Sequence, residues 1–402
     1  MATPVPQTDA IVLGKLSTSI LNQYEQALFF THFQSDVIRN KKGELSPPVS
    51  PIVRRREFES PIGQTKLTIP ALKNYNGDPH YGQAIVTGKG EKDKWDVVPV
   101  YINDIVFPYE GPGAVDEQRV KVLRLLARAR DRLALRLAQE DEIQTVSAFY
   151  EGRSRNVTAS TANNGLGKNK LYHPNFYSAS SGLATWSGTV QTHANNIGAK
   201  LDELAPNNIA HEMSVKNLEL LRSVVQDIPL DPVVISGKPY YPMLLHSNQM
   251  RQLRNDPLFN ENNSRAEVRG KDNPLFAMAE GYYANFLLYE RFLSVFGVNA
   301  ALSGGNYTLT FGATSPIKAR DKNPLKCAIV FGTNAISKGM VGGPRIGEQD
   351  QNIQGFKEFA IRQMIGMARN TMYDVDPDDA TPSTQLEQGS LIFATYSDEA
   401  WA

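Results

Sequence analysis

Hydrophobic side chains recur at helical spacing over one long stretch in the first half of the chain. From Asp116, a candidate N-cap, to Glu151 there is neither Gly nor Pro, and apolar residues return every three or four positions. This stripe consists of Val122, Leu126, Ala129, Leu133, Leu137, Ile143, Val146 and Tyr150. The pattern predicts a single helix over 116–151, about 50 Å long. Helices of this length are typical of bundles, coiled coils or structural spines.

Alternating and β-branched runs precede this helix and indicate strands. Thr65–Ile69 alternates polar and apolar residues, and 97–102 and 105–107 are rich in β-branched side chains. Because the charged segment 88–94 lies between these runs, we predict a long two-stranded excursion with an exposed tip, too thin to bury both faces. The first 57 residues hold only short apolar pieces and a proline-broken polar run, which predicts an arm that cannot close a core by itself.

The second half of the chain predicts a mixture of helices and strands. The polar stretch 153–186 predicts a long loop, and 214–226 predicts a helix capped by Ser214. Residues 240–246 are expected to form a strand that leads into a short helix over 247–254. Further predicted strands are 286–289, 307–311, 328–331 and 391–396.

Composition and charge exclude several classes of function. The 42 basic and 42 acidic residues give a net charge of zero, which excludes a polybasic nucleic-acid binder that relies on phosphate neutralisation. The single cysteine, Cys327, excludes disulfide frameworks and multi-cysteine zinc modules, and its apolar surroundings predict a core position. The N-terminal residues do not resemble a secretory signal, and no apolar run reaches the length of a membrane helix.

A search for chemistry assigns no catalytic, cofactor-binding or metal-binding residue. None of the three Gly-Lys pairs is followed by the Ser or Thr of a phosphate-binding loop, and no two of the six histidines lie within five residues of each other. There is no Gly-x-Ser-x-Gly motif. The acidic run Asp374–Asp379 could hold a hard cation, but its proline and its lack of the EF-hand glycine favour a solvated loop.

The long predicted helix carries a basic face with two open interpretations. The basic residues are Arg119, Lys121, Arg124, Arg128, Arg130, Arg132 and Arg136. This face is either the solvated side of an amphipathic helix, which we favour, or a contact for phosphates or an acidic partner. The charge reverses at Glu140, Asp141 and Glu142, a distribution that suits contact between identical subunits, basic half against acidic half.

The order of segments resembles a known fold. An arm, a thin hairpin, a long helix and a mixed remainder resemble the HK97-like fold of tailed-bacteriophage major capsid proteins, and short motifs resemble the N4-like phage group. The motifs in the helix are Asp116–Arg119, Ala127–Leu133 and Phe149–Arg153. Those further on are Leu245–Gln249, Leu253–Asp256, Asn273–Phe276, Glu280-Gly281, Ala328–Ile336 and Ile353–Lys357.

The resemblance implies an α+β chain in five parts. These are an N-terminal arm (1–57), an E-loop (58–112), a P-domain (113–238) with spine helix 116–151, an A-domain (239–351) and a C-terminal return to the P-domain (352–402). It also implies a structural, non-enzymatic protein that assembles as hexamers and pentamers into an icosahedral head around double-stranded DNA. The implied partners are other copies, a portal, scaffolding and decoration proteins, and DNA through weak non-specific contact, in a virion assembled in the bacterial cytoplasm.

The resemblance also selects candidate contact residues between subunits. On the spine these are Arg119, Arg124, Arg128 and Arg132, and on the E-loop Lys89, Lys92 and Lys94. Arg124 and Arg128 are expected near a subunit boundary or the shell interior, and no covalent crosslink is predicted at the lysines. The alternatives are another structural virion protein, or a soluble oligomeric enzyme with a metal site near Asp376.

Overall fold

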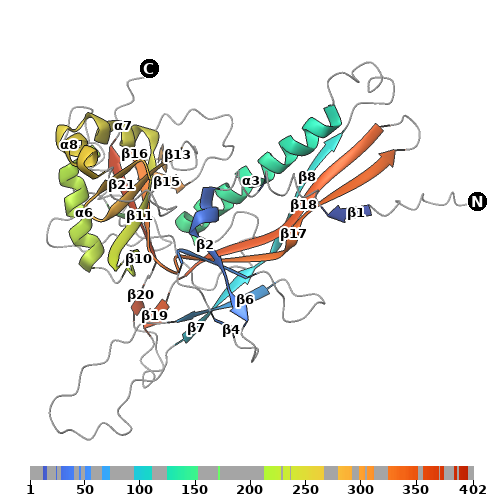
Figure 1. Ribbon diagram of the computed structural model, residues 1–402, viewed down its shortest axis with the longest axis horizontal. Coiled ribbons are helices and arrows are strands. Elements are labelled where there is room, and N and C mark those ends of the chain that lie inside the picture. Colours follow the sequence, from blue (N-terminus) through green and yellow to red (C-terminus); the bar gives the residue numbers. More distant parts are fainter. Residues whose placement is uncertain are drawn as a thin grey trace, which may run out of the picture.

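The computed structural model describes the elements that form the body of the chain. It covers residues 12–15, 24, 29–39, 45–46, 50–55, 66–72, 95–110, 125–152, 171–172, 212–227, 230–235, 237–266, 279–291, 298–303, 306–311, 325–351, 356–370, 372–374, 384–386 and 389–396. Two larger sheets and a long helix dominate this part (Figure 1). No helix among the described residues is both long enough and apolar enough to span a membrane.

The first sheet is built on a long antiparallel hairpin, β17 (Ile336–Gln351) and β18 (Phe356–Arg369). Its strand order is β2-β5-β17-β18-β8, and β1 also pairs with β17. The remaining strands are β1 (Val12–Lys15), β2 (Gln34–Asp36), β5 (Ile52–Arg55) and β8 (Asn103–Glu110). Figure 1 shows β17, β18 and β8 running away from the rest of the molecule beside helix α3. The hairpin spans the boundary at 351/352 that the resemblance implied between A-domain and C-terminal return.

Helix α3 (Leu125–Glu151) confirms the long predicted helix, whose first residues, 116–124, lie outside the described part. In its first half Leu133, Ala134, Leu137 and Ala138 are buried, while every residue over 141–149 is buried. The helix is therefore enclosed on all sides over 141–149. The helix ends at Gly152, which has a φ of 81° and donates its N–H to the Ala148 carbonyl, as the sequence break there predicts.

The second sheet is buried on both faces, which explains its continuous apolar runs. Its order is β12-β13-β11-β16-β21-β9, with β10 paired to β11. The strands are β9 (Leu171–Tyr172), β10 (Val233–Ile235), β11 (Lys238–His246), β12 (Gly281–Tyr283), β13 (Phe286–Arg291), β16 (Leu325–Phe331) and β21 (Ser390–Tyr396). Short pairs outside both sheets are β3 (Ile38–Arg39) with β4 (Leu45–Ser46), β14 (Val298–Ser303) with β15 (Asn306–Phe311), and β19 (Met372–Asp374) with β20 (Thr384–Leu386).

Side chains of the second sheet alternate between two cores. Helices α6 (Val215–Asp227), α7 (Ser247–Asn255) and α8 (Pro257–Ala266) cover one face (Figure 1). Met243 and Leu245 belong to the core beneath these helices, whereas Leu244 belongs to the core shared with α3 and the first sheet. Cys327 lies fully buried in the shared core, as predicted. The strands and helices predicted in this half are confirmed, including the Ser214 cap of α6.

The predicted two-stranded excursion is confirmed at its base. Strands β6 (Lys66–Leu72) and β7 (Trp95–Tyr101) pair antiparallel as a separate two-stranded sheet, and the charged tip 88–94 lies outside the described residues. The base packs on the chain's own first sheet, because Leu67, Ile69 and Val100 share a small core with Val53 and Ala368. The run predicted at 105–107 belongs to β8, in the first sheet rather than in the hairpin.

Parts of the N-terminal arm and of the predicted loop are integral to the fold. Tyr24, Phe30, Phe33 and Ile52 are buried in the shared core, so these segments of the predicted arm pack against the rest of their own chain. The physical reason is that the arm needs no core of its own, since its aromatic rings fill space between elements formed elsewhere. Within the predicted loop 153–186, Leu171–Tyr172 pairs parallel to β21.

Candidate inter-subunit surface

The two faces of the first sheet differ in what covers them. On β18, Ile361, Gln363 and Ile365 are buried on the side of α3, whereas Arg362 and Met364 point to the opposite side and remain partly exposed. Residues paired across an antiparallel ladder share a face. The register pairs Val106 of β8 with Arg362, and Asp104 with Met364, so these side chains lie on the same, outer face.

The β6–β7 hairpin covers only part of this outer face. Among the described residues, nothing covers a second region that we call the distal face. It consists of Asp104, Val106, Pro108, Val341, Arg345, Arg362 and Met364. Val106 is 48% exposed and Met364 is 38% exposed, although both are large apolar side chains in the middle of paired strands. An apolar centre with a charged rim is typical of a surface that contacts a partner.

The charged groups of the distal face are held in place. Arg362 and Asp104 form a two-bond ion pair across β18 and β8, with 3.0 Å between Arg362 Nε and Asp104 Oδ1. Asp104 raises the pKa of Arg362 further, so this arginine stays charged. Such a pair at the surface contributes little to stability, but it fixes the direction of both charges. The face therefore offers a defined pattern of charge around Val106 and Met364.

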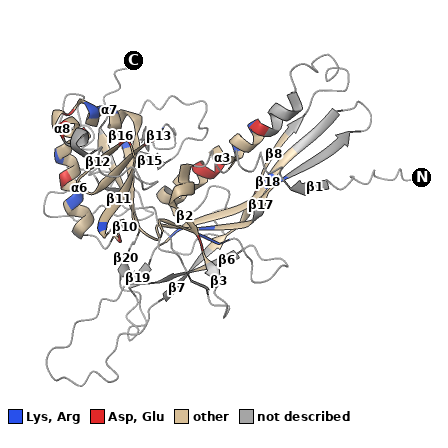
Figure 2. Cartoon of the chain, in the orientation of Figure 1, with Lys and Arg blue, Asp and Glu red and all other residues tan. Residues whose placement is uncertain are grey.

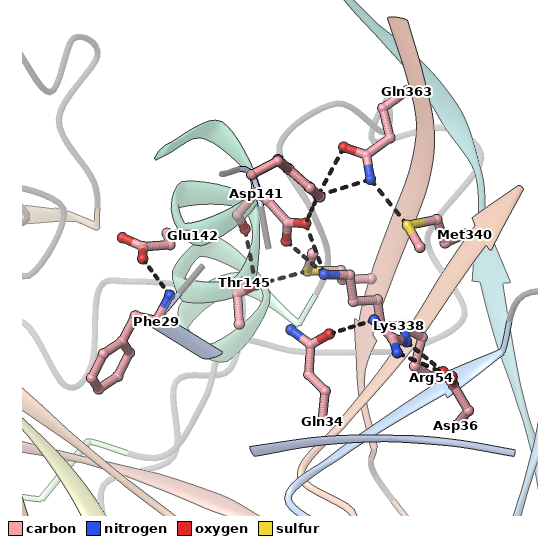
Figure 3. A network of polar contacts seen from close by, with 12 residues as sticks. Phe29, Gln34, Asp36, Arg54, Asp141, Glu142, Thr145, Lys338, Met340 and Gln363 are labelled. Carbon is pink, nitrogen blue, oxygen red and sulfur yellow. Dashed lines mark hydrogen bonds and ion pairs between the residues drawn. The ribbon is translucent and has the colours of Figure 1, made fainter. Parts of the chain in front are cut away.

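A buried polar cluster lies on the other side of the sheet, beneath α3 (Figure 3). Lys338 of β17 donates from Nζ to both carboxylate oxygens of Asp141, at 2.7 and 2.8 Å, and the two side chains are 1% and 2% exposed. Tyr24 donates its hydroxyl to Asp141 Oδ2 at 2.8 Å and accepts from Gln363 Nε2 at 3.0 Å. Burial, followed by the Asp141 charge, raises the pKa of Tyr24 well above its usual value. The cluster joins the arm, the helix and the hairpin β17–β18.

Glu142, the next residue of α3, makes a second buried contact. Its Oε1 accepts the backbone N–H of Phe29 at 2.9 Å and pairs with the guanidinium of Arg291 in β13. Burial raises the pKa of Glu142, and Arg291 opposes that rise. Because the pKa is raised in the folded state, folding favours the protonated form of Glu142. The resulting contribution to the free energy of unfolding is fully present below the unfolded-state pKa and is lost as the pH rises through the folded-state pKa.

Only two of the seven predicted contact residues, Arg128 and Arg132, lie in the part of the chain that the structure describes. Arg132 is exposed on α3, and Arg128 lies in the same helix, with its side chain outside the described part. The other five candidates, Arg119, Arg124, Lys89, Lys92 and Lys94, lie outside the described residues, so their role stays a prediction. Arg136 lies over the Phe107 ring, with Cζ 5.8 Å from the centroid, and so is not simply solvated.

The expected contact between the acidic half of the helix and another copy is wrong for two residues. Asp141 and Glu142 are buried and paired with Lys338 and Arg291 of the same chain. The reason is that α3 is enclosed on all sides over 141–149, so its carboxylates there must find internal partners. Figure 2 shows basic residues on α6 and α7 and acidic residues on α6 and α8. No group of His, Cys, Asp and Glu in the described part could hold a metal ion.

Comparisons with known proteins agree with this architecture. A family model described as phage capsid protein matches residues 13–378. The solved capsid of Ralstonia phage GP4 is similar over 100% of both chains, with a TM-score of 0.61 and 17% identity. The capsid of cyanophage Pam1 is similar over 84% of this chain and 87% of that chain, with a TM-score of 0.52 and 15% identity.

A third capsid, the acid-stable capsid of Helicobacter pylori bacteriophage KHP30, is similar over 86% of this chain and 88% of that chain, with a TM-score of 0.51 and 11% identity. A search of curated proteins finds no match. The fold is therefore the HK97-like capsid fold, with α+β architecture. The chain belongs to the phage capsid protein family and is a structural component of a bacteriophage head. Membership of the N4-like group stays a prediction.

Proposed function

We propose that this protein is the major capsid protein that assembles as hexamers and pentamers into the icosahedral head around the double-stranded DNA of a tailed phage. The single observation that carries the proposal is the distal face, a sheet surface of this family member with Val106 and Met364 exposed at its centre. A second copy is the occupant that best fits it, because a shell brings many identical surfaces together. Portal, scaffolding and decoration proteins would be further partners.

We also propose a division of the chain into domains. Because β17 and β18 pair along most of their length, we place the start of the C-terminal return near Ile336 rather than at 352. The A-domain would then comprise the second sheet and helices α6 to α8. The near balance of charge, with both signs on the helices, supports weak non-specific contact with DNA.

Electron microscopy tests the proposed function directly. The chain is expressed alone and with candidate scaffolding proteins of its phage, and particles are examined by negative stain. Closed shells, or rings of five and six copies, are the expected result. A uniform small oligomer under both conditions would contradict it and would favour the alternative of a soluble oligomeric protein.

Substitution of Met364 tests the distal face. Met364→Glu places a charge at the apolar centre of the face, and we expect the subunit concentration needed for shell assembly to rise by at least about tenfold, because a carboxylate loses its water when the face is covered. The matched control is Val234→Glu, since Val234 is 63% exposed on β10 in the second sheet. Sedimentation measures assembly, and thermal unfolding shows that both variants fold. Equal assembly by the two variants would rule out the distal face as a contact.

A further inference from the structure

The N-terminal segment supplies aromatic rings to the space between α3 and the second sheet. The 3-10 helix η1 (Phe29–Phe33) carries Phe30 and Phe33, which are 2% and 1% exposed. The Phe33 ring lies edge-on to Tyr289 of β13 and Phe331 of β16, with centroids 5.2 and 5.4 Å away. The Phe30 ring lies 6.4 Å from Phe149 of α3. One short segment thus contacts the helix and two strands of the second sheet.

Residues of α3 and β13 also make polar and cation–π contacts with this segment. The Phe29 N–H donates to Glu142 of α3, which pairs with Arg291 of β13. The Arg291 guanidinium lies over the Phe29 ring, with Cζ 4.3 Å from its centroid. Phe29 is therefore held by its backbone on one side and by its ring on the other (the Phe29–Glu142 contact is drawn in Figure 3). Helix, arm and second sheet are joined in a single closed set of contacts.

Helix α3 is attached to the first sheet and to the second sheet in different ways. Toward the first sheet, the helix is bound directly through Asp141 and Lys338. Toward the second sheet, its ion pair from Glu142 to Arg291 is covered by the Phe29 ring. If residues 29–33 left, that ion pair would meet water, and Tyr289 would lose the Phe29 and Phe33 rings. The Phe149 and Phe331 rings, whose centroids are 5.2 Å apart, would keep only each other. Docking of the segment and fixation of the helix are therefore linked energetically.

We propose that residues 29–33, with Glu142 and Arg291, form a clasp that fixes the spine helix α3 relative to the second sheet, and that undocking of the clasp releases this constraint within one subunit. The clasp is a conformational device of the subunit itself. It keeps this part of the arm on its own chain, where Tyr24 and strands β1, β2 and β5 of the arm also pack. Its existence does not depend on the proposed shell.

Hydrogen exchange of the full-length chain, followed by mass spectrometry, tests the clasp. Glu142→Ala removes both the acceptor of the Phe29 N–H and the partner of Arg291. We expect exchange to become about tenfold faster, and to the same extent, in 29–37, 143–149 and 286–291, since the loss of these hydrogen bonds opens all three together. Glu140→Ala is the matched control, because Glu140 accepts a hydrogen bond from Gln144 of its own helix.

A second variant covers the case in which Glu142→Ala does not fold. Arg291→Lys keeps the positive charge but removes the planar group that stacks on Phe29, so the same coupled increase in exchange is expected, to a smaller extent. The proposal is overturned if both variants exchange like Glu140→Ala. It is equally overturned if only 29–37 loosens while 143–149 and 286–291 keep their protection. Absence of shells in electron microscopy would contradict the proposed function but not the clasp.

Discussion

Replacement of Lys338 by Met is expected to lower the free energy of unfolding by about 3–5 kcal/mol, the typical cost of leaving one partner of a buried ion pair alone. Lys338 and Asp141 are 1% and 2% exposed, and both Asp141 oxygens face the ammonium group. Without Lys338, the carboxylate keeps only the Tyr24 hydroxyl as a side-chain donor in this cluster. Thermal or urea unfolding of the purified subunit measures the loss.

The control for this substitution is Lys238→Met. Lys238 also lies on a strand, β11, but it is exposed, so its replacement should change stability by no more than about 0.5 kcal/mol. The double variant Lys338→Met with Asp141→Asn removes both charges. It should be more stable than the sum of the two single losses predicts, because no uncompensated charge remains. Additive losses would show that the ion pair between Lys338 and Asp141 does not account for the stability lost in Lys338→Met.

Elements set by local pattern could be predicted from the sequence. The apolar stripe that ends at Gly152 locates the end of α3, and the apolar run at 240–246 locates β11, because periodicity and breakers act over a few residues. The resemblance in segment order led to the correct fold class, which the matching family and the solved capsids support. Local patterns, however, do not determine which distant segments share a core.

The residues of the buried cluster illustrate what local pattern misses. Lys338 stands in a strand beside Ser337 and Gly339, and Asp141 stands in an acidic run that looks solvated. Nothing near either residue indicates that they meet, since they are 197 positions apart. Phe30 belongs to one of the short apolar pieces of the arm, but its contact with Phe149 forms only once α3 is in place, and the contact of Phe33 with Phe331 needs the second sheet. The distal face likewise exists only once β8 and β18 are paired.

The second large effect is expected at Gly366, where the β6–β7 hairpin meets β18. A Cβ atom there would lie 1.9 Å from the Tyr101 carbonyl oxygen and 3.1 Å from the Ile102 Cα, and both are backbone atoms that cannot rotate away. Gly366→Ala should therefore push the hairpin off the sheet and lower the free energy of unfolding by about 3 kcal/mol, at the upper end of ordinary overpacking. Unfolding measurements give the size of the effect.

Gly343→Ala on the neighbouring strand β17 separates this effect from a general change in strand preference. A Cβ at Gly343 meets nothing within 4 Å, so this variant should keep wild-type stability or gain a few tenths of a kcal/mol. Hydrogen exchange locates the damage: in Gly366→Ala, protection should fall in β6 and β7 while β11 and β16 in the second sheet remain protected. If the hairpin kept its protection in Gly366→Ala, its base would not be anchored on its own subunit. The hairpin would then be free along its whole length to cover a neighbouring copy.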